Sequence, residues 1–127
     1  MVEEPLARDL EKSEALVKHL DSNGLPVRAA LWLYQSDAER WRFVLAFREK
    51  RKDYTTFYRD LAEAVNSSKN SEDLLDLSKV DVVDPESPLV ANLSKVLRMD
   101  GMGRARFTNN RINGILLEDA LIFRMAA

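Results

Sequence analysis

The sequence predicts an α+β fold, with a largely antiparallel sheet of about five strands and three amphipathic helices in the order α-β-β-α-β-α-β-β. Three observations support it. Apolar residues recur at helical spacing in three segments, two aliphatic and aromatic runs flank one short polar turn, and Pro, Gly and Asn mark the ends of segments. The 127 residues, 46% of them apolar, are enough for a single domain over residues 1–127 with its own core.

The first segment, from Pro5 to about Asp21, has the pattern of an amphipathic helix. Pro5 suits a first helical position, and Asn23-Gly24 is a strong stop signal. The apolar side chains that follow helical spacing are Leu6, Leu10, Leu16, Val17 and Leu20. We therefore expect one face of this helix to be buried.

A β-hairpin is predicted next, from Val27 to Tyr34 and from Trp41 to Phe47. The mostly polar residues 35–40 between these runs form a turn of hairpin length. Alternation places the odd-numbered side chains of the first strand on one face and the even-numbered ones on the other. We expect the odd-numbered face to meet the helices.

The middle of the chain is predicted to return to helix. Asp53 is placed to cap a helix that runs to about Val65, and residues 66–71 form a polar loop. One helical turn is predicted within residues 72–77. Residues 79–83 have the pattern of a short strand, which Pro85 stops.

The last third is predicted to contain one helix and a second hairpin. Ser87-Pro88 has the pattern of an N-cap followed by proline at the first helical position, and Gly101 ends that helix. A strand is expected over residues 104–108, a turn at Asn109-Asn110 and at least one further strand within residues 112–125. Asn113-Gly114 is either a bulge or a second tight turn.

The composition excludes several classes of function. Without cysteine the chain forms no disulfide, zinc-thiolate or iron–sulfur site, and His19 alone cannot build a multi-histidine metal site. No nucleotide-binding phosphate loop is present, so we expect no cofactor. No stretch approaches the ~20 apolar residues of a membrane span, and the first residues lack a signal-peptide pattern. We expect a cytoplasmic protein without membrane contact.

Several short stretches resemble a family of small uncharacterised bacterial proteins. They are Ala30-Leu31-Trp32-Leu33-Tyr34, Trp41-Arg42-Phe43-Val44-Leu45-Ala46, Asn113-Gly114, Glu118-Asp119-Ala120 and Ile122-Phe123-Arg124. The resemblance covers most of the chain and implies a stand-alone bacterial cytosolic domain. It implies no activity and no catalytic residue.

Arginine and aromatic side chains gather on the even-numbered face of the hairpin and on the later strands. The candidate binding residues are Arg28, Trp32, Tyr34, Arg42, Arg48, Arg104 and Arg106, which Arg124 could join. We expect the even-numbered side chains from Arg28 to Tyr34 to point outward. Arginines beside exposed aromatics stack on unpaired bases and neutralise phosphates, so nucleic-acid binding is one alternative. The other is a face covered by a helix or a twofold-related copy, with the arginines at its rim.

Carboxylates offer the one plausible route to catalysis. Asp81, Asp84 and Asp119 lie in or beside predicted strands, and two such groups close together could hold Mg²⁺ and assist phosphodiester hydrolysis. A turn or capping role explains Asp84, which stands beside a proline and before a helix, better than a metal site does, and the adjacent Glu118 and Asp119 point to opposite faces of a strand. A metal-dependent hydrolase therefore stays an alternative.

By elimination, the sequence favours a non-catalytic module that binds another protein or a second copy of itself. The side chains left over are apolar and aromatic, in excess of what one sheet face needs. Nucleic acid is less favoured, because the isoelectric point of about 5.5 is far below the basic values typical of nucleic-acid-binding domains. The pathway is not indicated.

Overall fold

The computed structural model describes residues 5–49, 54–112 and 114–126. Within them the elements are α1 (Ala7–Ser22), β1 (Val27–Gln35), β2 (Arg40–Phe47), α2 (Tyr54–Asn66), the 3-10 turns η1 (Ser71–Asp73) and η2 (Leu77–Lys79), β3 (Val80–Val82), α3 (Pro88–Ser94), β4 (Ala105–Ile112) and β5 (Ile115–Met125). The predicted α+β class is confirmed. The details differ, because 3-10 turns accompany the helices and the sheet is mixed.

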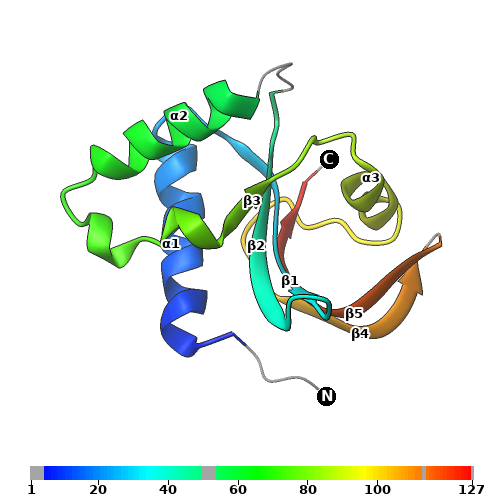
Figure 1. The fold of residues 1–127 in the computed structure, drawn as a ribbon. Coiled ribbons are helices and arrows are strands. Elements are labelled where there is room, and N and C mark those ends of the chain that lie inside the picture. The colour runs from blue at the N-terminus through cyan, green and yellow to red at the C-terminus, as the bar shows by residue number, and fades with distance from the viewer. Residues whose placement is uncertain (1–4, 50–53, 113, 127) are drawn as a thin grey trace.

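The described strands form one sheet in the order β3-β2-β1-β5-β4 (Figure 1). β1 lies between β2 and β5 and pairs antiparallel with both, and β4 pairs antiparallel with β5. β3 is parallel to β2, because the chain crosses over through α2 and the two 3-10 turns before it returns to the sheet. The sheet therefore has β3 at one edge and β4 at the other.

Helices cover both faces of the sheet. α1 and α2 lie on one face, and the short α3 lies on the other (Figure 1). The larger core joins Leu16 and Leu20 of α1 to Trp32, Phe43 and Phe123 of the sheet. The smaller core, under α3, contains Val90, Leu93, Leu31, Val44 and Ile122. α3 spans only seven residues, so it covers its face less completely than α1 and α2 cover theirs.

The first helix lies where periodicity predicted it, with small differences at its ends. Helical hydrogen bonding starts at Ala7 rather than Pro5, and Leu6 occupies the N-cap position without a side-chain capping bond. At the other end the backbone N–H of Leu25 donates to the carbonyl of Leu20. Gly24 permits that closure, because its φ of 79° is a conformation that other residues rarely adopt.

The second hairpin turns later than predicted. A turn at Asn109-Asn110 is wrong: β4 continues through both residues, and Asn110 pairs with Leu117. Asn109 has a φ of 50°, so it bends the strand rather than ending it. Ile112 pairs with Ile115, and Gly114, directly before β5, has a φ of 84°. Asn113, the other half of the predicted bulge or tight turn, lies outside the described residues.

The predicted end and N-terminal cap of the third helix differ in the structure. The third helix ends at Ser94 rather than near Gly101, and Ser87 lies at its N-cap position without a capping hydrogen bond. The Ser87 hydroxyl is buried and has no partner. The predicted cap at Asp53 lies outside the described residues.

Candidate functional site

Trp32 lies in the core. Its side chain is 1% exposed, its ring is 5.1 Å from that of Phe43, and its Nε1–H donates to the Ser13 hydroxyl of α1 at 3.0 Å. The Ser13 hydroxyl donates in turn to the carbonyl of Leu10. The prediction that Trp32 points outward is therefore wrong, because α1 packs on the even-numbered face of β1. A signal was present: Ser13 lies at helical spacing with Leu10 and Val17, on the buried stripe.

Tyr34, by contrast, lies near the end of β1 and is only partly buried. Its ring meets Trp41 of β2 edge-on, with 5.5 Å between centroids. Arg106 places its guanidinium carbon 5.9 Å from the centre of the same indole. Two of the predicted residues, Tyr34 and Arg106, thus lie together around Trp41, which was not among the predicted site residues.

The Arg106 guanidinium forms an ion pair with a buried carboxylate. Its Nε donates to Asp119 at 2.8 Å and its Nη2 donates at 2.5 Å, while the Asp119 side chain is only 2% exposed. An ionised group so buried is stable only with a paired opposite charge. The two hydrogen bonds hold the Arg106 guanidinium in place, and the Asp119 carboxylate neutralises its charge within the molecule.

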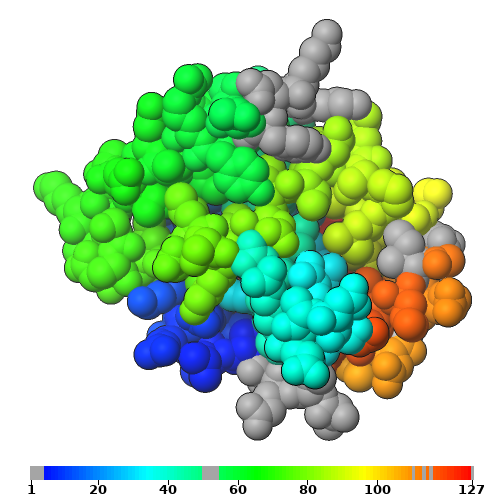
Figure 2. Space-filling model, in the orientation of Figure 1, coloured from blue at the N-terminus to red at the C-terminus, as the bar shows by residue number. Residues whose placement is uncertain are grey.

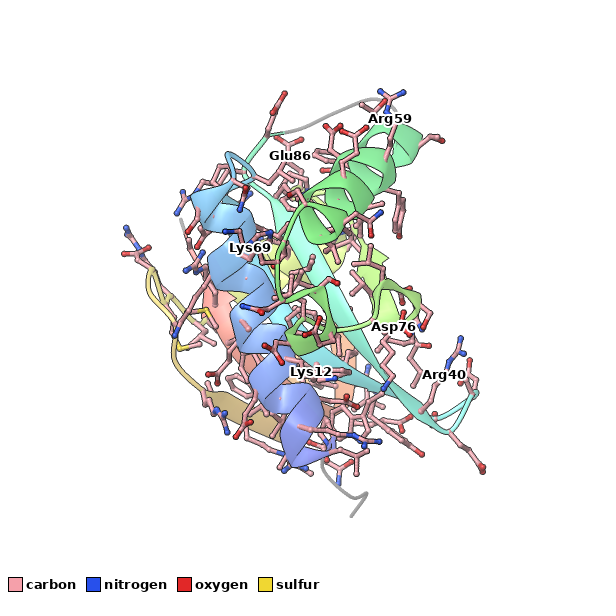
Figure 3. The ribbon with its side chains drawn as sticks, turned by 90° about the vertical axis from the view of Figure 1, so that its left-hand side faces the viewer. Lys12, Arg40, Arg59, Lys69, Asp76 and Glu86 are labelled. Atoms are coloured by element: carbon pink, nitrogen blue, oxygen red, sulfur yellow. The ribbon has the colours of Figure 1, made fainter. Side chains whose placement is uncertain are left out.

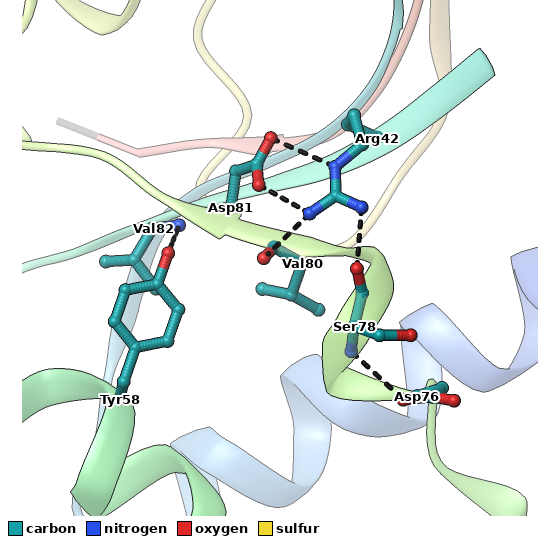
Figure 4. Close-up of polar contacts among 7 residues, drawn as sticks. All are labelled: Arg42, Tyr58, Asp76, Ser78, Val80, Asp81 and Val82. Carbon is teal, nitrogen blue, oxygen red and sulfur yellow. Dashed lines mark hydrogen bonds and ion pairs between the residues drawn. The ribbon is translucent and has the colours of Figure 1, made fainter. Parts of the chain in front are cut away.

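Arg42 is held in a similar way on the other side of the sheet (Figure 4). Its Nε and Nη2 donate to Asp81 at 3.1 and 2.5 Å. Nη1 donates to the carbonyl of Ser78, and Nη2 also donates to that of Val80. The hydrogen bond to Asp81, with that carboxylate's charge, raises the pKa of Arg42 above its ordinary value, against a smaller opposing effect of burial.

The other predicted arginines are dispersed. Arg28 donates to the carbonyls of Pro85 and Ala126, and Arg104 pairs with Glu14 of α1 at 2.7 Å. Arg124 pairs with Asp21 at 2.7 Å and joins the end of α1 to β5. Arg48 is exposed and follows β2 directly. The structure therefore does not bring the predicted arginines onto one outward face.

Two carboxylates of the hydrolase alternative, Asp81 and Asp119, lie far apart in the sheet. Asp81 lies on β3 and Asp119 on β5, three strands apart in the sheet, which corresponds to about 14 Å. Asp84 accepts the backbone N–H of Glu86 in the turn before α3. Among the residues that the structure describes, no three His, Asp or Glu side chains are grouped to hold a metal ion.

The edges of the sheet differ sharply in what covers them. β3 has three residues, and the N–H of Val82 donates to the Tyr58 hydroxyl of α2 at 2.9 Å (Figure 4). The carbonyl of Val80 accepts from Arg42. β4 has eight residues and pairs with β5 alone among the described strands. Thr108, Asn109 and Arg111 of β4 are exposed. The outer edge of β4 is therefore the candidate site, and sequence reasoning missed it because strand order is not visible in a sequence.

Arg111 distinguishes this edge chemically. Arg104 and Arg106 have carboxylate partners within the molecule, whereas no described residue forms an ion pair with the exposed Arg111. The sequence holds no Asp or Glu from residue 101 to residue 117. Arg111 is thus a positively charged side chain of β4 that has no ion-pair partner among the described residues.

No helix among the described residues is both long enough and apolar enough to span a bilayer. Comparison of the chain with family models, with curated proteins and with solved structures finds no match.

Proposed function

We propose that this protein is a non-catalytic binding module that takes an extended segment of another protein onto the outer edge of β4. The carrying observation is that β4 is eight residues long and has β5 as its one neighbour among the described strands, whereas side chains bind backbone groups of the other edge, β3. A cytoplasmic location, and membership of the small bacterial family that the sequence resembles, belong to the same proposal.

A strand edge binds through its backbone. Alternate residues of β4 direct their N–H and C=O groups away from β5, so an added strand receives main-chain hydrogen bonds without needing a deep pocket. Proteins usually protect such an edge by shortness, cover or charge. β3 shows the first two of these devices, and β4 shows neither.

Charge favours another protein over a second copy as the occupant. Two β4 strands paired antiparallel would place two Arg111 side chains in one ribbon, and β4 itself holds no Asp or Glu that could pair with them. Like charges on neighbouring strands are destabilising. A segment with a carboxylate beside Arg111 would instead supply the partner that this side chain lacks.

The test uses two peptides of opposite charge and one pattern, Ac-Val-Glu-Val-Glu-Val-Glu-NH2 and Ac-Val-Lys-Val-Lys-Val-Lys-NH2, added to uniformly ¹⁵N-labelled protein. We expect the glutamate peptide to shift the amide resonances of residues 105–112 and to slow their exchange with solvent. The lysine peptide should do so at least about fivefold more weakly. Arg111→Glu should reverse that order of preference.

Arg59→Glu is the matched control, because Arg59 is an exposed arginine of α2, far from β4 (Figures 1 and 3). It should leave both affinities unchanged. The proposal fails if neither peptide affects β4. It also fails if the free protein is a dimer in light scattering with its β4 amides already protected, because a second copy would then occupy the edge.

A further inference from the structure

A surface groove lies on the α3 side of the sheet, where β1 ends and β5 begins. Its volume is about 420 Å³, and its apolar lining includes Leu33 of β1, Leu89 of α3 and Leu116 of β5. Leu116 is 51% exposed and lies next to the other apolar residues of the groove. α3 is too short to cover this end of its face. The groove therefore leaves apolar surface in contact with water.

The polar residues that line the groove carry one sign of charge. Asp37, in the turn after β1, and Glu118 of β5 contribute carboxylates, and no basic residue lines the groove in the described part of the chain. The Ser36 hydroxyl donates to Glu118 Oε1 at 2.8 Å and lies 3.5 Å from Asp37 Oδ1. Figure 2 shows this turn, in cyan, against the orange-red start of β5.

These two carboxylates contrast with the acidic groups elsewhere in the sheet. Asp81 and Asp119 each face an arginine, whereas neither Asp37 nor Glu118 has an ion pair with a described residue. Both are exposed, and the Ser36 hydroxyl that hydrogen-bonds to Glu118 also lies next to Asp37. A cation placed beside the apolar lining would meet two negative charges without displacing an existing partner.

We infer that this groove binds a segment of a partner protein in which an aliphatic side chain lies next to lysine or arginine. The aliphatic group would bury Leu116 and its neighbours, and the cations would pair with Asp37 and Glu118. The inference does not depend on the β4 edge, whose proposed partner has the opposite charge. The two surfaces can therefore be tested separately.

Three short peptides separate the apolar contribution from the charge. They are Ac-Arg-Leu-Arg-NH2, Ac-Glu-Leu-Glu-NH2 and Ac-Arg-Gly-Arg-NH2, each titrated into protein carrying ¹³C-labelled leucine methyl groups. We expect the first peptide to shift the methyl resonances of Leu33, Leu89 and Leu116 and to bind at least about fivefold more tightly than the other two. Raising the salt from about 0.05 to 0.5 M should weaken it.

The double variant Asp37→Asn/Glu118→Gln should weaken the Arg-Leu-Arg peptide by about tenfold, because it removes both charges and keeps the shape. Glu72→Gln/Asp73→Asn, an exposed acidic pair in η1, is the matched control and should change nothing. The inference is overturned if the three peptides bind equally, if none binds, or if the shifts appear outside the groove.

Discussion

The two edges of the sheet are built on different principles. The β3 edge is short, and side chains from α2 and β2 occupy its outward backbone groups, through the Tyr58 hydroxyl on Val82 and the Arg42 guanidinium on Val80. The β4 edge is longer and has only β5 beside it in the described sheet. Since both edges carry the same kind of backbone groups, the difference shows that closure here comes from particular side chains.

The arginine pairs behind the two edges differ in burial as well. Asp81, which Arg42 holds near β3, has a side chain that is 38% exposed, whereas the Asp119 side chain near β4 is 2% exposed. Water can solvate Asp81 when its partner is lost, but it cannot reach Asp119 in the folded state. The ion pair next to the open edge is therefore the one whose loss leaves a buried, unsolvated charge. Removing each arginine in turn should show this difference in the free energy of unfolding.

Removal of the buried partner should give the largest effect. We expect Arg106→Leu to lower the free energy of unfolding by about 3–5 kcal/mol, because the Asp119 carboxylate is left buried without a cation. Arg42→Leu should lower it by only about 1 kcal/mol. Urea denaturation at pH 7 measures both. The double variant Arg106→Leu/Asp119→Leu should recover much of the loss, and equal losses in the two single variants would contradict the comparison.

Hydrogen exchange should distinguish the edges without any mutation. In β4 we expect one alternate set of amides to exchange at least about a hundredfold faster than the other, because only one set points toward β5. The Val82 amide of β3 should fall with the protected set, since Tyr58 accepts its hydrogen. Uniform protection along β4 in the free protein would mean that the edge is occupied.

Removing the hydrogen bond between Tyr58 and Val82 at the β3 edge should lower the free energy of unfolding by less. Tyr58→Phe removes the hydroxyl that accepts from Val82, and we expect a loss of about 0.5–1.5 kcal/mol with faster exchange of the Val82 amide. Tyr34→Phe is the control, because the Tyr34 hydroxyl forms no hydrogen bond with a described residue. This variant should leave the exchange of the Val82 amide unchanged. If Tyr58→Phe has no effect on Val82, water already closes this edge and the hydroxyl is dispensable.

The smallest effect is expected from Asp76, which caps the 3-10 turn leading into β3. The backbone N–H of Ser78 donates to its carboxylate at 3.0 Å, and chiefly through that hydrogen bond it lowers the pKa of Asp76 below the ordinary value of 3.8. The stabilisation is therefore present above pH 3.8 and is lost as the pH falls below it. Asp76→Ala should be slightly less stable than the natural protein at pH 6 and equal to it near pH 2, as measured by thermal unfolding. A difference that persists at pH 2 would exclude the carboxylate charge as its cause.

Local structure could largely be predicted from the sequence, and the candidate site could not. Helical spacing located α1, and alternating apolar residues located β1 and β2, because both signals depend only on neighbouring residues. Two turn signals competed in the second hairpin. Asn109-Asn110 was preferred, but pairing with the long β5 carried β4 on to the tighter turn at Gly114.

The burial of Trp32 could not be predicted from periodicity. The alternation in β1 separates two faces that are both apolar enough to be buried. It therefore does not say which helix packs on which face. The choice depends on Ser13, nineteen residues away, whose hydroxyl accepts the indole N–H in the core. The pairs Arg106–Asp119 and Arg124–Asp21 are likewise formed between segments that only folding brings together.

The sequence by itself determined the fold class, most of the elements and the absence of thiol chemistry, since these follow from composition and from the spacing of near neighbours. Only the tertiary structure decided which arginines are paired, which helix covers each face of β1 and which strand lies at an open edge. The physical reason is that burial, ion pairing and strand order are contacts between distant segments, and their free energies depend on all of those segments at once.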